Sequence, residues 1–365
     1  MAKKMYIGVN DVARKVKKGY IGVNGVARCF FKSVGLVYSG QTTDLSSARE
    51  YLVATSVGSY ALFAGGHTGS AYSAAVDAYN ASLTRSTPTV LSNSRYNHAA
   101  ASNSSYALFA GGWGSSSSRL SSVEAYNTSL TRSSPTGLLS VKEYLAGTSV
   151  GDYALFGGGY GASTTSSVVD AYSSSMTKSI PTALSVSRQL LTATNVGNYA
   201  LFAGGRDDSG LSTVVDVYDS SLTRSVASAL SVARYNAVGT SVGNYALFGG
   251  GQASSGYSAV VDTYNSSLTK GLATSLTTGR DYLAATSVGE YALFGGGSSS
   301  SGRESVVDIY DVSLTKYYDT DVSTSLGLAR CGLAAASVGE YAIFAGGYNS
   351  SASSPSAYAE AYKLD

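Results

Sequence analysis

The stretch NYALFGGG at residues 244–251 decides the fold, because near-copies of it recur along the whole chain. Each copy opens its apolar run with a tyrosine, and these tyrosines are Tyr60, Tyr106, Tyr153, Tyr199, Tyr245, Tyr291 and Tyr341. Their spacings are 46, 47, 46, 46, 46 and 50 residues. A near-constant period in this range indicates repeat units, none of which can bury a core alone.

Each repeat is predicted to hold four short antiparallel strands, which can be followed in the fifth copy. Residues 235–242 (YNAVGTSV) are small and apolar, and a Gly-Asn turn joins them to a second strand at 245–251. A third strand at 259–264 (AVVDTY) leads through an Asx-type turn to a more polar fourth strand at 268–276. We name these strands A, B, C and D.

Four-stranded units with this period build a β-propeller, and the two chain ends favour it over an open β-solenoid. The seventh repeat supplies strands A, B and C but no D strand. Residues 36–49 (LVYSGQTTDLSSAR) align without gaps to 82–95 (SLTRSTPTVLSNSR), which contain the first D strand. We therefore predict an all-β, seven-bladed propeller over residues 36–365. Its last blade would be completed by the N-terminal strand, which removes free sheet edges.

The motif order within a repeat resembles a known family. A cation precedes strand A, a Tyr-x-x-Phe phrase ending in glycines forms strand B, and V-[DE]-x-Y forms strand C. This order resembles the kelch repeat over residues 36–365, and the resemblance implies a propeller used mostly for protein binding. The tryptophan typical of the fourth kelch strand is replaced by SLT or SMT, and Trp113 falls in an expected loop. The repeat is therefore similar to a divergent kelch type.

The first 35 residues form a separate basic segment, with eight Lys or Arg and one Asp. Residues 6–18 (YIGVNDVARKVKK) and 20–32 (YIGVNGVARCFFK) each read as strand, Asn-Asp or Asn-Gly turn, strand. These tandem hairpins resemble N-terminal segments of tail-associated structural proteins in phages and prophages of Gram-positive bacteria. Two hairpins alone are marginally stable. We therefore expect residues 1–35 to dock on a virion or oligomer partner, or else to form a flap on the propeller itself or a basic, partly ordered leader.

The repeated charges and aromatic residues are predicted to be structural. One cation precedes strand A in every repeat: Arg49, Arg95, Lys142, Arg188, Arg234, Arg280 and Arg330. One acid lies on every strand C: Asp77, Glu124, Asp170, Asp216, Asp262, Asp308 and Glu360. Seven copies argue for bidentate ion pairs that brace each blade rather than for a catalytic site. The strand-B Phe and strand-C Tyr should pack between blades, and the diglycines should allow close backbone approach.

Differences among the copies are concentrated on one predicted face. The A–B turns are nearly identical, whereas the B–C loops range from HTGSAYSAA to RDDSGLSTV. These loops share a face with the D–A junctions, where extra tyrosines gather among Ser, Gly and Asn, as in binding surfaces. The predicted ligand-binding residues are Tyr51, Tyr72, Tyr96, Trp113, Tyr144, Tyr160, Arg206, Tyr235, Tyr257, Tyr282 and Tyr348. Alternatively, the tyrosines that open strand A only fill the central channel.

We expect no catalytic site, metal or cofactor. His67 and His98 are too few for a transition-metal site, and the arginines and acids are spread one per repeat. No phosphate-binding loop, nucleophile elbow or dinucleotide fingerprint is present. The sequence therefore favours a non-enzymatic recognition protein.

The predicted partner is a host-surface glycan or protein at the B–C/D–A face, with a phage or prophage tail as the setting. The alternative is a bacterial protein-interaction scaffold of kelch type. A net charge of +2 with 13% charged residues does not favour nucleic acid. The N-terminus lacks the apolar segment of a secretory signal, and no apolar run reaches membrane-spanning length. We therefore expect synthesis in the bacterial cytoplasm, location in the virion and no membrane insertion.

Overall fold

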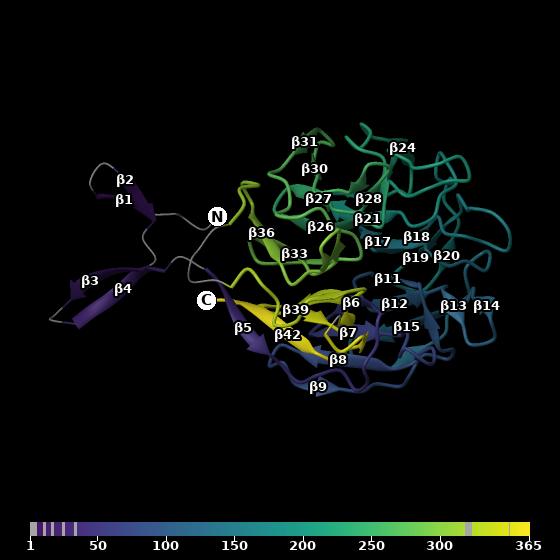
Figure 1. Ribbon diagram of the computed structural model, residues 1–365, viewed down its shortest axis with the longest axis horizontal. Coiled ribbons are helices and arrows are strands. Elements are labelled where there is room, and N and C mark those ends of the chain that lie inside the picture. The colour runs from purple at the N-terminus through teal and green to yellow at the C-terminus, as the bar shows by residue number, and fades with distance from the viewer. Residues whose placement is uncertain are drawn as a thin grey trace.

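The computed structural model describes residues 6–9, 12–15, 18–23, 26–32, 35–317, 323–349 and 351–365. Every regular element in these ranges is a β-strand (Figure 1). Antiparallel sheets follow one another along the chain, one for each repeat. Within the described ranges, six of these sheets have four strands and one has three.

Strand A lies innermost in each sheet and pairs with strand B. The A strands are β6 (Val53–Val57), β11 (Ala99–Ser102), β17 (Ala146–Val150), β21 (Thr192–Val196), β26 (Val238–Val242), β32 (Ala284–Val288) and β38 (Ala334–Val338). The B strands are β7 (Tyr60–Ala64), β12 (Tyr106–Ala110), β18 (Tyr153–Gly157), β22 (Tyr199–Ala203), β27 (Tyr245–Gly249), β33 (Tyr291–Gly295) and β39 (Tyr341–Ala345). Each A strand contacts the next, and β38 contacts β6, so the inner strands close into a ring as in a β-propeller.

Strands C and D complete the sheets on the outside. The C strands are β8 (Val76–Asn80), β15 (Val123–Asn127), β19 (Val169–Tyr172), β23 (Val215–Asp219), β30 (Val261–Asn265), β36 (Val307–Asp311) and β42 (Ala359–Leu364). The D strands are β9 (Arg85–Ser86), β16 (Arg132–Ser133), β20 (Lys178–Ser179), β24 (Arg224–Val226), β31 (Lys270–Leu272) and β5 (Leu36–Gln41).

Two expectations about strand D are wrong. The predicted strand 268–276 ends at Leu272, because Leu276 turns inward and is buried in the core. In the sixth repeat, the described residues hold only three strands, and Lys316 makes an isolated bridge to Tyr310 at the fourth position. This is the repeat with the longer, 50-residue spacing, so its extra residues fall where strand D would form.

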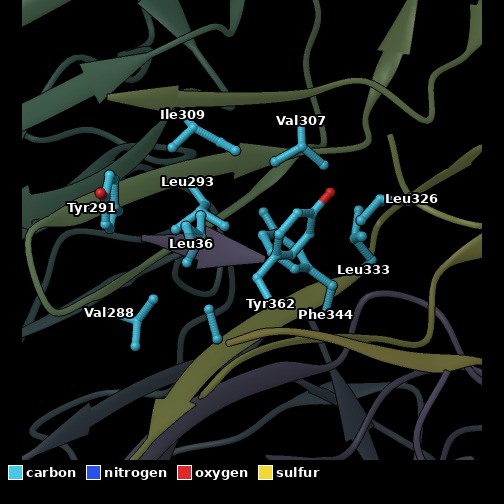
Figure 2. Packing of buried hydrophobic residues seen from close by; sticks show 12 residues of the cluster. Leu36, Val288, Tyr291, Leu293, Val307, Ile309, Leu326, Leu333, Phe344 and Tyr362 are labelled. Atoms are coloured by element: carbon cyan, nitrogen blue, oxygen red, sulfur yellow. The ribbon is translucent and has the colours of Figure 1, made fainter. Parts of the chain in front are cut away.

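The predicted closure by the N-terminal strand is confirmed. Strand β5 pairs antiparallel with β42, with Leu36 opposite Leu364 and Gly40 opposite Ala361. Leu36 is buried between the last two sheets beside Leu293 and Phe344 (Figure 2). The outer edge of the last sheet is therefore covered by a strand from the other end of the chain.

The N-terminal segment forms the two predicted hairpins, drawn in purple in Figure 1. Strand β1 (Tyr6–Val9) pairs with β2 (Val12–Lys15), and β3 (Lys18–Val23) pairs with β4 (Val26–Lys32). Two-residue connections separate the paired strands, and these connections lie outside the described residues. The partner of the hairpins stays a prediction.

The glycines that end the repeated phrase allow neighbouring backbones to approach closely. Gly250 and Gly251 have φ of 71° and 96°, a region that favours glycine. A Cβ added to Gly250 would lie 2.6 Å from the carbonyl oxygen of Arg280, and one on Gly251 would lie 2.7 Å from that of Tyr235. The predicted close approach of neighbouring backbones is therefore confirmed.

The strand-B Phe and strand-C Tyr pack as predicted between neighbouring sheets. Phe248 and Tyr264 lie edge to face at 5.9 Å and are buried against Val217 of the preceding sheet. Burying one such ring contributes about 1.5–3 kcal/mol to the free energy of unfolding. The Tyr264 hydroxyl donates a hydrogen bond of 2.6 Å to the carbonyl of Ser228, which also belongs to the preceding repeat.

The predicted cation–acid pair is present and buried in all seven repeats. In the fifth, Arg234 Nη2 lies 2.8 Å from Asp262 Oδ2 and also donates to the carbonyl of Phe248. The expected bidentate geometry is wrong, because Lys270 and the Ser231 N–H occupy the other carboxylate oxygen. Four further repeats have a second cation at the equivalent position: Arg85, Lys178, Arg224 and Lys316.

Candidate functional site

A residue with left-handed backbone precedes strand A in every repeat, two positions after the buried cation. These residues are Tyr51, Asn97, Tyr144, Leu190, Asn236, Tyr282 and Gly332, with φ between 49° and 63°. Backbone hydrogen bonds join them around the axis: the Tyr144 N–H donates to Asn97 at 3.0 Å, and the Leu190 N–H donates to Tyr144 at 2.9 Å. The left-handed residue turns the chain, so strand A and the residues before it run in different directions.

The tyrosines predicted to open strand A therefore fall into two groups. Tyr51, Tyr144 and Tyr282 occupy the left-handed position, whereas Tyr96 and Tyr235 lie one residue earlier. The five tyrosines therefore occupy two different positions before strand A. The sequence could have separated the groups by counting from the buried cation.

The residue just before the left-handed position pairs with the B–C loop, and this pairing is here called the ladder. Its partner is the residue after each diglycine, as in Tyr96 with Trp113 and Tyr235 with Gln252. The short strands of this ladder are β10 (Arg95–Tyr96), β13 (Trp113–Gly114), β14 (Ser118–Arg119), β25 (Arg234–Tyr235), β28 (Gln252–Ala253), β29 (Gly256–Tyr257), β34 (Ser298–Ser299), β35 (Gly302–Arg303), β37 (Arg330–Cys331), β40 (Tyr348–Asn349) and β41 (Ser354–Pro355). The D–A junctions and B–C loops thus lie on one face, here called the loop face. Trp113 begins β13, so the expectation that it lies in a loop is wrong.

A cavity of about 210 Å³ lies where the central channel meets the loop face. Tyr51, Tyr144 and Tyr282 line it together with Asn97 and Asn236, and its apolar wall includes Leu52, Leu145, Leu191, Leu283 and Leu333. Tyr282 is 38% exposed, so its ring is accessible from solvent. The cavity is therefore aromatic at its mouth and apolar along its wall.

Four predicted tyrosines form a continuous cluster across the loop face. The ring of Tyr51 lies 5.6 Å from Tyr282 and 6.4 Å from Tyr96, and Tyr72 stacks on Tyr96 at 5.0 Å. Tyr51 belongs to the first repeat and Tyr282 to the sixth. They meet because the seventh repeat has Gly332 between them, where a Cβ would lie 3.2 Å from the Tyr51 ring.

Trp113 and Tyr160 meet through an arginine that sequence reasoning missed. The Arg119 guanidinium lies 5.0 Å from the Trp113 ring centre and 4.5 Å from that of Tyr160. It also pairs with Glu143 at 3.0 Å, so it is held in one orientation. Arg303 lies over Tyr348 in the same way, at 4.8 Å.

The remaining predicted residues lie further around the loop face. Tyr235 and Tyr257 flank Gln252 in the fifth-repeat ladder, and Tyr257 is 37% exposed. Arg206 is exposed and forms a bridge with Gln189. The structure therefore places ten of the predicted residues in one tyrosine cluster, two arginine-centred groups and a separate sector of the fourth and fifth repeats, and it places Tyr144 at the cavity.

The sequence analysis also missed three acidic residues, each at the position that pairs with a B–C loop. Glu50, Glu143 and Asp281 each follow the buried cation by one residue, which is the signal that could have found them. Burial raises the pKa of all three, although Arg119 opposes this for Glu143 and His67 opposes it for Glu50. Burial raises the pKa of Asp281 to about 6. In the described part of the chain, no cation pairs with Asp281.

The two histidines occupy different environments. His67 lies on the loop face, 3.8 Å from Glu50, whereas His98 is buried and takes the position that leucine has in most repeats. Across the described ranges, no group of three or more His, Cys, Asp or Glu side chains is placed to hold a metal ion. The same ranges contain no helix long and apolar enough to cross a membrane.

Comparison with known proteins bears on the fold. No protein-family model and no curated protein matches the sequence. The solved structure of YjhT, a kelch-type β-propeller-like fold, is similar with a TM-score of 0.57 and 10% sequence identity. The match covers 72% of this chain and 93% of YjhT. At this identity the likeness concerns the fold alone: the chain is similar to a kelch-type β-propeller.

Proposed function

We propose that this protein is a non-catalytic recognition propeller of divergent kelch type, with seven blades over residues 36–365 and a separate attachment segment over 1–35. Its ligand, a surface glycan or protein, binds at the loop face. The observation that carries the proposal is the partly exposed tyrosine cluster built from Tyr51, Tyr72, Tyr96 and Tyr282. Tyrosine offers a large contact area and loses little side-chain entropy on binding.

Variation and invariance within the chain support this assignment. The seven ion pairs, diglycines and Phe–Tyr contacts account for the repeated residues, and they are buried. The positions that differ between repeats, such as Glu50, Tyr96 and Gln189, lie together on the loop face. A scaffold of repeated blades thus presents one non-repeating surface.

The proposed setting is a phage or prophage tail, with the tandem hairpins joining the propeller to the virion and the loop face turned to the host. It rests on the resemblance of residues 1–35. A bacterial protein-interaction scaffold is the second candidate, and it rests on the resemblance of the repeat to the kelch type. Both candidates use the same face, and a glycan ligand would favour the tail setting over the protein-interaction scaffold.

A four-site variant tests the loop face. Changing Tyr72, Tyr160, Tyr257 and Tyr348 to Ser should abolish binding to a bacterial-surface glycan array, or to a captured partner protein, because the rings supply the contact area. Thermal unfolding should stay close to the wild type, since these side chains lie outside the sheet core. A matched variant, Tyr199→Ser with Tyr245→Ser at the opposite end of strand B, should keep the binding. Undiminished binding by the four-site variant would refute the proposal.

A further inference from the structure

The cavity at the channel mouth is lined by three tyrosines that come from well-separated repeats. Tyr51, Tyr144 and Tyr282 belong to the first, third and sixth repeats, and all three have left-handed backbone. Around the closed ring of A strands these repeats are two, three and two positions apart, so the tyrosines lie on different sides of the axis. Among the described residues, no lysine or arginine lines the cavity.

Each of the three tyrosines directly follows an acidic residue in the sequence. The acids are Glu50, Glu143 and Asp281, and the other four repeats have Tyr96, Gln189, Tyr235 and Cys331 at this position. Acid and cavity tyrosine therefore occur in the same three repeats. The backbone turn does not require them, because the other four repeats form it with neither.

The charges around the cavity favour a positively charged ligand. Burial raises the pKa of the three phenol groups, and the acid before each one raises it further. Arg119 pairs with Glu143, and the Arg303 charge opposes that of Glu50. No cation pairs with Asp281 in the described part of the chain, and its pKa of about 6 leaves it ionised at pH 7.5. One negative charge next to the cavity is therefore not offset.

From this arrangement we propose that the cavity binds a quaternary ammonium group, with the rings of Tyr51, Tyr144 and Tyr282 around it. Such a cation is attracted by aromatic rings, and its methyl groups suit an apolar wall. The Tyr51 and Tyr282 rings are inclined by 72°, so they share no plane for a flat ligand, whereas a compact cation can contact each ring separately.

The size of the cavity agrees with this ligand. An apolar cavity of roughly 150 Å³ accepts benzene, so about 210 Å³ leaves room for a trimethylammonium group. Tyr282 is 38% exposed, so the group can enter from the loop face while the rest of the ligand stays outside. The inference rests on the proposed function, and it names the chemical group that the loop face would recognise.

Ligand-detected NMR of the full chain with choline at pH 7.5 tests the inference. Choline should bind at least tenfold more tightly than 3,3-dimethylbutan-1-ol, which has the same shape without the charge. Two further ligands distinguish the source of the group. Tighter binding of phosphocholine than of choline would indicate a decorated surface glycan, and tighter binding of trimethyl-lysine would indicate a modified protein.

Substitutions at the cavity separate the ring from the charge. Tyr282→Leu should weaken choline binding tenfold or more, and leucine suits this backbone because Leu190 has φ of 54° at the equivalent position. Tyr282→Phe keeps the ring and should weaken binding less than threefold. Asp281→Asn should weaken choline binding at least threefold and leave the neutral alcohol unaffected. Tyr257→Leu is the matched control, because Tyr257 is exposed on the same face but does not line the cavity, and it should bind choline like the wild type.

Three results would overturn the inference: no binding of choline, equal affinity for choline and the neutral alcohol, or full choline binding by both Tyr282→Leu and Asp281→Asn. The four-tyrosine variant keeps all three cavity tyrosines, so it tests the proposed function separately. If it loses array binding while choline does not bind the wild type, the proposed function stands and the cavity inference falls. If it keeps array binding, the proposed function falls whatever the result with choline.

Discussion

At the scale of single residues, His98 shows how one side chain departs from the repeat. Leucine occupies its position in five of the repeats, where it fills the space beside a diglycine of the preceding repeat. The His98 ring does the same against Gly65 and is only 4% exposed. Burial, followed by the nearby Arg95 charge, holds the pKa of His98 well below its ordinary value of 6.5.

This environment predicts a specific dependence of stability on pH. Since the folded state disfavours protonated His98, stability is fully present above the ordinary pKa of 6.5 and falls as the pH drops below it. The loss should approach about 1.4 kcal/mol per pH unit for one proton. His98→Leu should remove this component between pH 7 and 5.5, measured as the urea midpoint. A slope in His98→Leu equal to that of the wild type would contradict the prediction.

At the scale of elements, the end of strand B controls how closely neighbouring sheets approach. The diglycines have positive φ, and a Cβ added to one of them would lie less than 3 Å from a carbonyl oxygen before strand A, as at Gly250 and Gly251. The repeat therefore needs glycine for two reasons, backbone conformation and space. The Phe294 ring of the sixth repeat depends on the same approach, because a Cβ added to the neighbouring Gly249 would lie 2.8 Å from it.

Two glycine variants distinguish the effect of backbone conformation from the effect of limited space. Gly256→Ala should cost only the strain of positive φ, about 1–3 kcal/mol, because no atom lies within 4 Å of the added Cβ. Gly250→Ala should cost more, because its Cβ would lie 2.6 Å from the Arg280 carbonyl oxygen and push two sheets apart. Free energies of unfolding in urea measure the difference. Equal losses would mean that only backbone strain matters.

At the scale of the whole molecule, closure joins the two chain ends. Strand β5 completes the last sheet, and Leu36 is 1% exposed within the core between the sixth and seventh repeats (Figure 2). Strand β42 would otherwise present an unpaired edge, which is prone to association. The ring of A strands is therefore secured by a strand that is remote in sequence.

Truncation tests this closure. Removal of residues 1–35 should leave the thermal midpoint of the propeller nearly unchanged, because β5 remains. Removal of residues 1–41 should lower stability by at least the ~1.5–3 kcal/mol of a buried leucine and promote association. Differential scanning calorimetry and light scattering report the two effects. A midpoint unaffected by the longer truncation would show that β5 does not secure the ring.

Prediction from the sequence was most successful where the same residue type recurs at the equivalent position of every repeat. The period, the A–B–C pairing, the buried ion pairs and the closure by residues 36–41 all follow from local patterns copied seven times. The site was predicted in part. Extra tyrosines on one face were recognised, but Arg119 was not, because it occurs once and has no sequence pattern of its own.

By itself, the sequence determined the all-β repeat and its register. The alternation of side chains along each strand, the turn residues and the glycines all determine structure through residues that are close in the chain. Only the tertiary structure decided which single-copy residues meet. Closure brings Tyr51 of the first repeat to Tyr282 of the sixth across Gly332, and the packing of consecutive repeats places Asp281 beside Asn236 of the fifth. The physical reason is that such contacts arise around a ring axis, where residues of different repeats converge.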